Sequence, residues 1–481
     1  MRSLCLLILL SFPLNCVAQQ SDRQQFIRVE APLIALTNVR VIDGTGGAPR
    51  EDQTIVIREG KIDWVGPAAD AKVTGEVKIL DLKGYTVLPG LVGMHDHMFF
   101  PMGGNPPMYS NMGLSFSRLY LALGVTTIRT TGSVQPYLDL EIKKLIDGGR
   151  MIGPKMHITG PYLEGLGSFT PVMHTLTGPD DARKLVNYWA DQGASSFKAY
   201  MNITRDELRS AVEEAHKRGL KVTGHLCSIG YKEAAEIGID NLEHGLLPDS
   251  EFVPNKQPDK CPGAAVGQSL RSLDINCEPV KETIRTLVAK NVAVTSTLPV
   301  FEAGAPLASS QAGPTAIGAS STLLNQRMLN VMNNEARVRY LTARSRIAAD
   351  SPSPILIRKS MDFERAFVAA GGLLLAGLDP TGNGGGVAGF GDLREVELLV
   401  EAGFTPVEAI KIATLNGAKF LGEDSRIGSV AVGKQADLMI VKGNPAAKIT
   451  DIENIEIVFK DGVGWDSEKL IQSVQGLVGI R

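Results

Sequence analysis

Short apolar runs alternate with amphipathic helical patterns from about residue 88 to residue 402. The eight apolar runs cover residues 88–98, 125–132, 155–163, 195–201, 221–227, 239–245, 292–299 and 373–380. The helical patterns between and after them include residues 180–192, 204–218, 281–290 and 393–402. Repeated strand–helix alternation is typical of parallel βαβ units, and eight such units close into a barrel. The sequence therefore predicts an α/β fold with a TIM-like (β/α)8 barrel, assigned to residues 88–425.

Both ends of this region follow a different pattern. β-like runs at 34–42, 54–58, 61–65 and 77–82 are separated by Gly, Pro and Asp turns, and similar runs recur at 437–441 and 455–459. We therefore predict a small composite β-sandwich domain built from residues 27–87 and 426–470. Residues 302–352 form an insertion before the last strand–helix unit, for which a lid, an oligomer contact and a plain surface excursion all stay open.

The N-terminus has the order of a secretory signal peptide. Arg2 precedes an apolar run at 4–14, and Cys16, Val17 and Ala18 then provide a small-residue cleavage site. No later segment approaches the ~20 uninterrupted apolar residues of a membrane span. We therefore expect residues 1–18 to be removed and the mature protein to be exported, either to the periplasm or outside the cell.

Composition and cysteine content limit the function further. With 44% hydrophobic residues, 21% charged residues and a net charge of −3, the chain is typical of a soluble enzyme for small molecules, without a nucleic-acid partner. Three cysteines follow the predicted signal peptide. Cys261 and Cys277 flank a short loop that a disulfide could close, although two free thiols fit the sequence nearly as well.

Two histidines stand at the end of the first predicted strand. His95 and His97 occupy positions i and i+2, so both imidazoles face the same side while Asp96 faces away. By itself a His-x-His pair often arises by chance. Its weight comes from the other strands, where chemically similar residues recur at the same end: Lys198, His225, His244 and Asp379.

These six side chains meet at one face of the predicted barrel, which is where barrel active sites are built. Imidazole and carboxylate groups are suitable ligands for a divalent ion such as zinc. Lys198 is unusual among them because an ammonium group would repel the metal. A buried lysine readily loses its proton, and the neutral amine can take up carbon dioxide to give a carbamate that bridges two cations.

The chain resembles the amidohydrolase superfamily, in the branch related to imidazolonepropionase and secreted Xaa-Pro dipeptidases. The similar segments are residues 88–97 (LPGLVGMHDH), 124–129 (GVTTIR), 241–245 (NLEHG) and 428–438 (GSVAVGKQADL). The match extends over roughly residues 30–465. In this family the resemblance implies a metal-dependent hydrolase that acts on amide or peptide bonds.

The resemblance also implies roles for individual residues. One metal would be held by His95, His97 and Asp379, the other by His225 and His244, and carbamylated Lys198 would bridge the two, which are expected to be zinc. A bridging hydroxide would be the nucleophile, and Asp379 would pass its proton to the leaving amine. Tyr200 lies on the same strand face as Lys198 and is a candidate to polarise the scissile carbonyl.

Two further residues bear on this site. His174 lies in the loop after the third strand, where relatives carry a histidine near the substrate, and it is predicted to contact the substrate. Cys227 shares a strand face with His225, at a position where some relatives carry a second histidine. This departure affects only the surroundings of the second metal.

The sequence leads to one main function and several alternatives. We predict hydrolysis of the amide bond of a dipeptide, such as Xaa-Pro, or of an N-acyl amino acid. A mononuclear deaminase or cyclic-amidine hydrolase is the first alternative, but such enzymes generally lack the lysine on the fourth strand. Lactone or organophosphate hydrolysis and a metal-free binding protein on the same barrel also stay open, as does assembly into a homo-oligomer.

Overall fold

The computed structural model describes residues 23–71, 75–104, 107–308, 313, 316–318 and 322–479. The predicted signal peptide, residues 1–18, lies outside the described residues. None of the helices formed by the described part of the chain combines the length and apolar character needed to span a bilayer.

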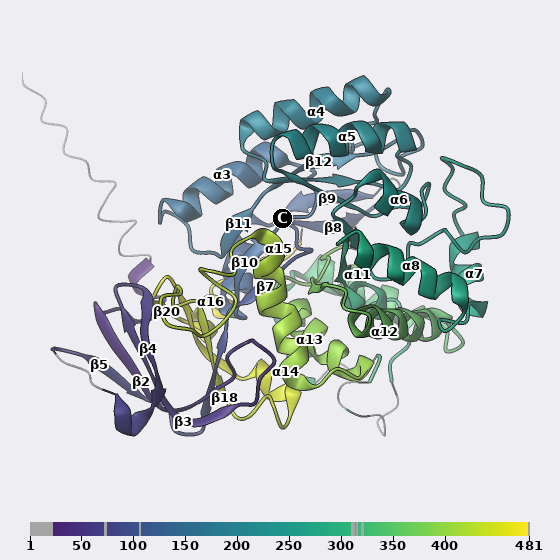
Figure 1. Cartoon of the computed structure of the whole chain (residues 1–481). Coiled ribbons are helices and arrows are strands. Elements are labelled where there is room, and N and C mark those ends of the chain that lie inside the picture. The colour runs from purple at the N-terminus through teal and green to yellow at the C-terminus, as the bar shows by residue number, and fades with distance from the viewer. Residues whose placement is uncertain are drawn as a thin grey trace, which may run out of the picture.

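Parallel strands in two sheets form the centre of the larger part of the molecule (Figure 1). One sheet has the order β11-β10-β7, and the other has the order β12-β13-β14-β15-β16-β17. Their bounds are β7 (Leu91–Gly93), β10 (Val125–Arg129), β11 (Lys155–His157), β12 (Thr159–Leu163), β13 (Ser196–Ala199), β14 (Lys221–Gly224), β15 (Asn241–Glu243), β16 (Ala293–Ser296) and β17 (Leu374–Ala376). Each of the eight apolar runs predicted from the sequence contains at least one of these strands.

Backbone contacts join the two sheets on both sides. Ser133, just beyond β10, forms a parallel bridge with Pro161 of β12. On the opposite side, the Met94 N–H at the end of β7 donates to the Ala376 carbonyl of β17 over 2.9 Å. The parallel strands therefore end at a common face, which receives the residues that follow them.

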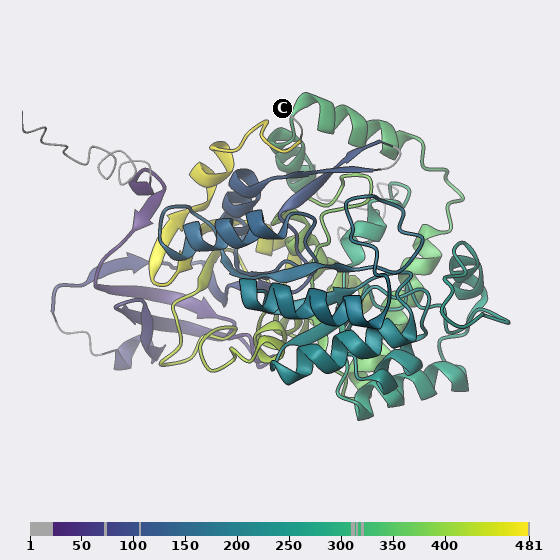
Figure 2. The same ribbon diagram turned by 90° about the horizontal axis from the view of Figure 1, so that it is seen from above.

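Helices surround the parallel strands on the outside (Figures 1 and 2). Helix α5 (Arg205–Lys217) shows why: its apolar residues form one buried face, and a capping box between Thr204 and Glu207 fixes its start. Outside the region of the insertion, the other α-helices of the described residues are α2 (Gly113–Ala122), α3 (Pro136–Asp147), α4 (Pro179–Gln192), α6 (Tyr231–Ile237), α7 (Ala265–Ser272), α8 (Glu278–Ala289), α12 (Ser353–Ala369), α13 (Phe390–Ala402), α14 (Pro406–Lys411), α15 (Gly417–Leu421) and α16 (Ser467–Gln472).

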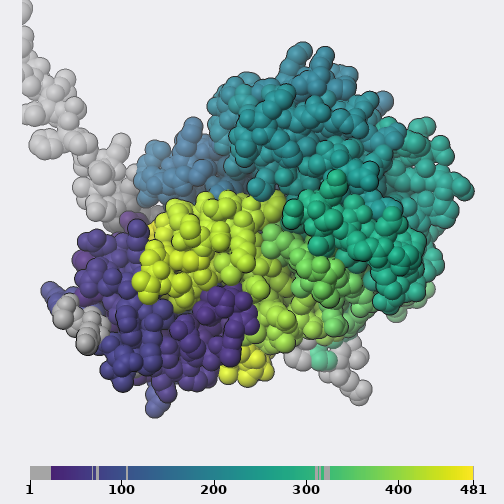
Figure 3. Space-filling model, viewed as in Figure 1, coloured from purple at the N-terminus to yellow at the C-terminus, as the bar shows by residue number. Residues whose placement is uncertain are grey.

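Segments from both ends of the chain form a separate nine-stranded sheet, and the prediction that both ends contribute to one β-rich unit is confirmed. Its strands are β1 (Ile27–Val29), β2 (Leu33–Val41), β3 (Arg50–Arg58), β4 (Lys61–Pro67), β5 (Lys78–Asp81), β6 (Tyr85–Pro89), β18 (Leu438–Lys442), β19 (Ile455–Lys460) and β20 (Val463–Asp466). The antiparallel pair β6–β18 joins the two ends, and Figure 3 shows the purple N-terminal residues against the yellow-green C-terminal part. The strand pairing links all nine strands into one hydrogen-bonded sheet. The predicted sandwich would instead consist of two sheets that are not hydrogen-bonded to each other.

A hairpin and the insertion lie together on one side of the molecule (Figure 2). The hairpin pairs β8 (Phe99–Gly103) with β9 (Met108–Asn111). Helix α9 (Leu298–Glu302) leads into the insertion, which carries α10 (Thr322–Val331) and α11 (Asn334–Ser345). The guanidinium of Arg339 in α11 lies so close to Gly103 that a Cβ atom there would overlap it. The insertion therefore packs onto the hairpin that follows the first barrel strand.

Candidate metal centre

The six predicted ligands come from five parallel strands and point toward one another at their carboxyl ends. His95 and His97 follow β7, His225 follows β14, His244 follows β15, Asp379 follows β17, and Lys198 lies in β13. His244 and Asp379 have positive φ angles of 71° and 53°. Such strained backbone in non-glycine residues is often found where a side chain must be held in a particular direction.

Asp379 is the centre of the group. Its Oδ1 lies 3.4 Å from His97 Nε2, and its Oδ2 lies 3.8 Å from both His95 Nε2 and His244 Nε2. His95, His244 and Asp379 each offer one ligand atom within 4.8 Å of the others. These three buried residues could hold a metal ion.

Lys198 and His225 extend this cluster. The Lys198 Nζ lies 3.0 Å from His95 Nε2, and the His225 ring lies 4.4 Å from the His244 ring. The structure therefore brings all six predicted side chains together. His225 joins the cluster through the contact of its ring with the His244 ring.

Outer hydrogen bonds orient three of the histidines. The Nδ1 of His95 pairs with Glu243 Oε2 at 2.7 Å, His97 Nδ1 donates to the Gly132 carbonyl at 3.0 Å, and His244 Nδ1 pairs with Thr297 Oγ1 at 2.7 Å. With Nδ1 occupied in each ring, Nε2 is the nitrogen left to face the centre.

The chemistry of the donors fits a divalent cation. Burial lowers the pKa of His95 to about 4 and that of His225 to about 3, so both rings are neutral and keep a lone pair at neutral pH. The His244 Nε2 is buried and has no hydrogen-bond partner among the described residues. A buried nitrogen without a partner is unfavourable unless something else satisfies it, and a cation at this point would do so.

Lys198 has the properties that a carbamate requires. Burial lowers its pKa to about 8, although the charges of Asp379 and Glu243 oppose this shift. A substantial fraction of the side chain is therefore the neutral amine in mildly alkaline solution, and only this form can react with carbon dioxide.

A buried charged pair supports the first histidine, and sequence reasoning missed it. Arg129 in β10 donates from Nη2 to Glu243 Oε1 at 2.7 Å, while the other Glu243 oxygen meets His95. Arg129 also donates to the Met94 carbonyl, which fixes the backbone just before His95. The available signal was an arginine at the end of an apolar strand and a glutamate directly before His244.

Asp96 lies on the other side of the strand, as its position between the two histidines predicts. Burial and the nearby Asp392 of α13 raise the pKa of the Asp96 carboxyl well above its usual value. It therefore belongs to a buried acid pair behind the first strand.

Of the two predicted substrate contacts, the structure brings one to the cluster. The Tyr200 ring lies 4.9 Å from the His225 ring, and the Lys198 Nζ lies 5.6 Å above its centre. His174 is 47% exposed at its side chain and pairs with Asp181 at the start of α4 over 3.0 Å. Its contact with a substrate stays a prediction.

Two other tyrosines lie near Asp379, and neither was singled out from the sequence. Burial and the charge of Asp379 raise the pKa of Tyr109 to about 12. The Tyr162 ring lies 6.4 Å from the His97 ring and 4.9 Å from the Tyr200 ring. Tyr109 lies in β9 and Tyr162 in β12, and neither strand bears an unusual motif at these positions, so only the three-dimensional arrangement identifies them.

The disulfide in this region matches neither of the two arrangements that the sequence left open for Cys261 and Cys277. Cys261 pairs with Cys227, and Cys277 is free, so the suggested Cys261–Cys277 pair was wrong. The two bonded residues have Cα atoms 4.7 Å apart, whereas Cys277 lies at the N-cap of α8. The bond therefore attaches the turn two residues beyond His225 to the loop that follows the sixth barrel strand.

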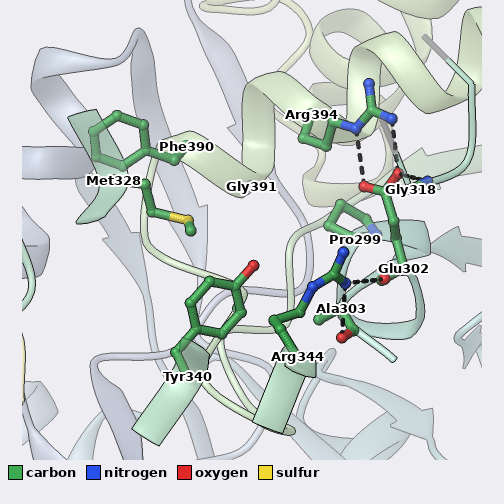
Figure 4. A pocket seen from close by; sticks show the side chains of 11 residues that line it. Pro299, Glu302, Ala303, Gly318, Met328, Tyr340, Arg344, Phe390, Gly391 and Arg394 are labelled. Carbon is green, nitrogen blue, oxygen red and sulfur yellow. Dashed lines mark hydrogen bonds and ion pairs between the residues drawn. The ribbon is translucent and has the colours of Figure 1, made fainter. Parts of the chain in front are cut away.

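A separate small cavity lies beside α9 (Figure 4). Its volume is about 50 Å³, and its walls include Tyr340, Arg344 and the ion pair between Arg394 and Glu302. None of the six clustered side chains lines it. The cavity is thus distinct from the candidate metal centre.

The parallel strands and the buried histidine–aspartate cluster at their carboxyl ends are typical of a hydrolase. The Amidohydrolase family model matches residues 86–463, and the chain belongs to this family. The predicted enzyme class, a hydrolase, is confirmed by this match.

Relatives with curated names match in different ways. An imidazolonepropionase of Pseudomonas entomophila is 42% identical over 55 residues, which is 11% of this chain and 13% of that protein. A 5'-deoxyadenosine deaminase of Methanobrevibacter smithii is 41% identical over 59 residues, 12% of this chain and 14% of that protein. The chain thus spans only a small part of these two relatives. The ochratoxinase of Aspergillus niger is 23% identical over 465 residues, which is 84% of this chain and 80% of that protein.

Solved structures share the fold over nearly the whole chain. An Xaa-Pro dipeptidase with bound methionine has a TM-score of 0.64 and 20% identity, covering 90% of this chain and 100% of that one. A bottromycin amidohydrolase has a TM-score of 0.65 and 19% identity, covering 95% and 96%. At these identities the likeness shows the fold alone.

Proposed function

We propose that this protein hydrolyses the amide bond of a dipeptide or an N-acyl amino acid at a binuclear metal centre. The observation that carries the proposal is the convergence of His95, His97 and His244 on Asp379 at the carboxyl ends of parallel strands, with Lys198 in contact with His95. Closure of these strands into a single (β/α)8 barrel is part of the proposal, supported by the backbone contacts that join the two sheets.

The six side chains divide between two cations, which we propose to be zinc. The first would be held by His95, His97 and Asp379, the second by His225 and His244, with carbamylated Lys198 shared between them. When bound, the two cations would act as Lewis acids and lower the pKa of a water molecule toward neutrality. The neutral rings, their occupied Nδ1 atoms and the lowered pKa of Lys198 support this assignment.

The chain's own groups then move the proton and stabilise charge. Asp379 would accept the proton of the attacking water on a carboxylate oxygen and deliver it to the nitrogen of the leaving amine. Burial raises the pKa of Tyr200 well above its usual value, so its hydroxyl stays protonated and can donate to the carbonyl oxygen of the substrate. Peptide-bond cleavage would then release an amine and a carboxylic acid.

The names of similar proteins agree with an amide substrate. The structures with the same fold include an Xaa-Pro dipeptidase and a bottromycin amidohydrolase. The mononuclear deaminase alternative draws on relatives that match over a small part of their length, and Lys198 within the cluster favours two metals over one. Hydrolysis of lactones or organophosphates would use the same groups.

We also propose that the protein is exported, because residues 1–18 have the order of a signal peptide. The Cys227–Cys261 disulfide supports an oxidising compartment such as the periplasm. The proposed domains are the barrel at 88–425 and a β domain from 27–87 and 426–470.

A hydrolysis screen with a metal count tests this function. Zinc-loaded protein would be offered N-acyl amino acids and dipeptides, including Xaa-Pro, and the metal content would be measured on the same sample. Two ions per chain and release of a free amino acid are the expected results. One ion per chain that is unaffected by Lys198→Ala would exclude the binuclear centre, and no turnover of any substrate would favour a binding protein.

A further inference from the structure

Two series of aromatic rings lead outward from the histidines of the candidate centre. On one side, Phe99 stacks on His97 at 4.4 Å, and Tyr109 meets Phe99 at 5.2 Å. On the other, Tyr200 lies 4.9 Å from His225, and Phe169 lies 6.1 Å from Tyr200. We call Phe99, Tyr109, Tyr162, Phe169 and Tyr200 the aromatic wall.

The two series come from different segments that touch each other. Phe99 and Tyr109 belong to the β8–β9 hairpin, and Phe169 belongs to the loop between β12 and α4. The Thr170 hydroxyl donates to the Pro107 carbonyl at 3.5 Å, which connects that loop to the hairpin. Tyr162 lies between them, 4.9 Å from Tyr200, and Phe99, Tyr162 and Met173 form one buried apolar cluster.

The outer end of the wall is exposed. Phe169 is 44% exposed, and its loop also carries Leu166 at 88% and Val172 at 47%. Single exposed apolar residues are common, but this short loop exposes three. One of them, Phe169, is in ring contact with Tyr200, which packs against the buried cluster of Phe99, Tyr162 and Met173. A molecule that approached the candidate metal centre along the aromatic wall would meet apolar side chains from the exposed Phe169 inward to Tyr162 and Phe99.

We propose that the aromatic wall selects amide substrates with an aromatic or large apolar group on one side of the scissile bond. This inference rests on the proposed function and names its substrate class. The rings would cover the apolar group of the substrate in offset or edge-to-face contact, which contributes beyond the removal of apolar area from water. The wall consists of phenylalanine and tyrosine side chains, so it contributes no lysine, arginine or carboxylate group to that part of the substrate.

A matrix of four substrates tests the proposal. N-acetylalanine has no large apolar group, N-benzoylalanine has one on the acyl side, N-acetylphenylalanine has one on the amine side, and N-benzoylphenylalanine has both. We expect kcat/KM of the zinc-loaded wild-type protein to be at least about tenfold higher for one of the two singly aromatic substrates than for N-acetylalanine. Equal kcat/KM for all four would overturn the proposal.

Variants of Phe169 assign the selectivity to the wall. Phe169→Ala should lower kcat/KM about tenfold for the preferred aromatic substrate, through KM, and less than about twofold for N-acetylalanine. Phe169→Tyr should restore the preference. Tyr188→Ala is the matched control, because Tyr188 is a 48% exposed residue of α4 that contacts Trp189 and Tyr137, which lie outside the wall.

The outcomes separate this inference from the proposed function. Hydrolysis of the four substrates with kcat/KM values that Phe169→Ala leaves unchanged, or lowers by the same factor for N-acetylalanine as for the aromatic substrates, would refute selection by the wall while leaving the amidohydrolase intact. No hydrolysis of any of the four, with two metals bound, would count against the proposed function as well. Unfolding curves of each variant show whether the protein remains folded.

Discussion

Glu243 contacts His95 through one carboxylate oxygen, at 2.7 Å, and Arg129 through the other, also at 2.7 Å. All three side chains are buried. Arg129 keeps Glu243 ionised, since the pKa of that carboxyl is lowered to about 2 by Arg129 and His95 although burial opposes this. The carboxylate can then hold the Nδ1 proton of His95, so Nε2 faces Asp379.

We therefore predict that Glu243→Gln weakens metal binding by about 10- to 100-fold, the usual effect of losing a carboxylate behind a histidine ligand. Competition between the protein and a chromophoric chelator measures the affinity directly. Glu364→Gln is a suitable control, because Glu364 is equally buried but pairs with Ser296 and Ser360. Unchanged affinity in the Glu243 variant would mean that His95 is oriented by other contacts.

Lys198→Ala should reduce the metal content from two ions per chain to one and lower kcat at least about a hundredfold, because the carbamate would be lost together with one metal. Metal analysis of the dialysed protein and rates on the best substrate measure both effects. Lys198→Arg keeps a positive charge but cannot form the carbamate.

If Lys198→Arg keeps both metals and full activity, the lysine acts only as a cation. Reloading metal-free wild-type protein with zinc gives a second readout: recovery of activity should be slower in buffer freed of carbon dioxide than in bicarbonate.

The strand pattern and the grouping of the six side chains could be predicted because each depends on local sequence. Alternating apolar runs report strand position, and the end of a parallel strand fixes which face a side chain reaches. His95, His225 and Asp379 could thus be assigned to one face without knowing any distance between them.

What could not be predicted depends on contacts between distant segments. Arg129 and Glu243 are 114 residues apart, and nothing in either strand identifies the other as its partner. The pairing of Cys227 with Cys261 could not be predicted for the same reason, because their spacing in the sequence does not show that they meet in the fold. Spacing alone drew attention to Cys261 and Cys277, which flank a shorter loop. The aromatic wall arises only when the hairpin meets the loop that carries Phe169.

Removal of the disulfide should destabilise the protein. The bond closes a loop of 34 residues, for which the chain-entropy relation gives about 4 kcal/mol. We expect Cys227→Ser and Cys261→Ser to lower the free energy of unfolding by about 2–4 kcal/mol in urea titrations, and dithiothreitol to have a similar effect on the wild type.

Cys277→Ser provides the control, because Cys277 is a free thiol and its substitution should leave the urea midpoint unchanged. A loss of stability in Cys277→Ser as large as that in Cys261→Ser would contradict the observed pairing. A further consequence concerns the turn beyond His225: if it is held by the bond, reduction should also weaken metal binding.

A buried acid behind the sixth and seventh strands should make stability depend on pH. Burial raises the pKa of Glu364 to about 8 from 4.5, while hydrogen bonds from Ser296 and Ser360 oppose this shift. Between these two values the unfolded chain gives up the proton and the folded protein keeps it. The folded state then binds more protons, so stability falls as pH rises through this window, by at most about 1.4 kcal/mol per pH unit, and levels off above pH 8.

Glu364→Gln isolates this contribution because the amide resembles the protonated acid and does not titrate. The free energy of unfolding of both proteins would be measured in urea at intervals from pH 5 to pH 9. We expect the wild type to lose stability relative to the variant as pH rises, since only its carboxyl must be kept neutral in the fold. If the difference in the free energy of unfolding between the two proteins stays constant across this pH range, Glu364 has the same pKa in the folded and unfolded states. Its burial between Ser296 and Ser360 would then have no effect on its ionisation.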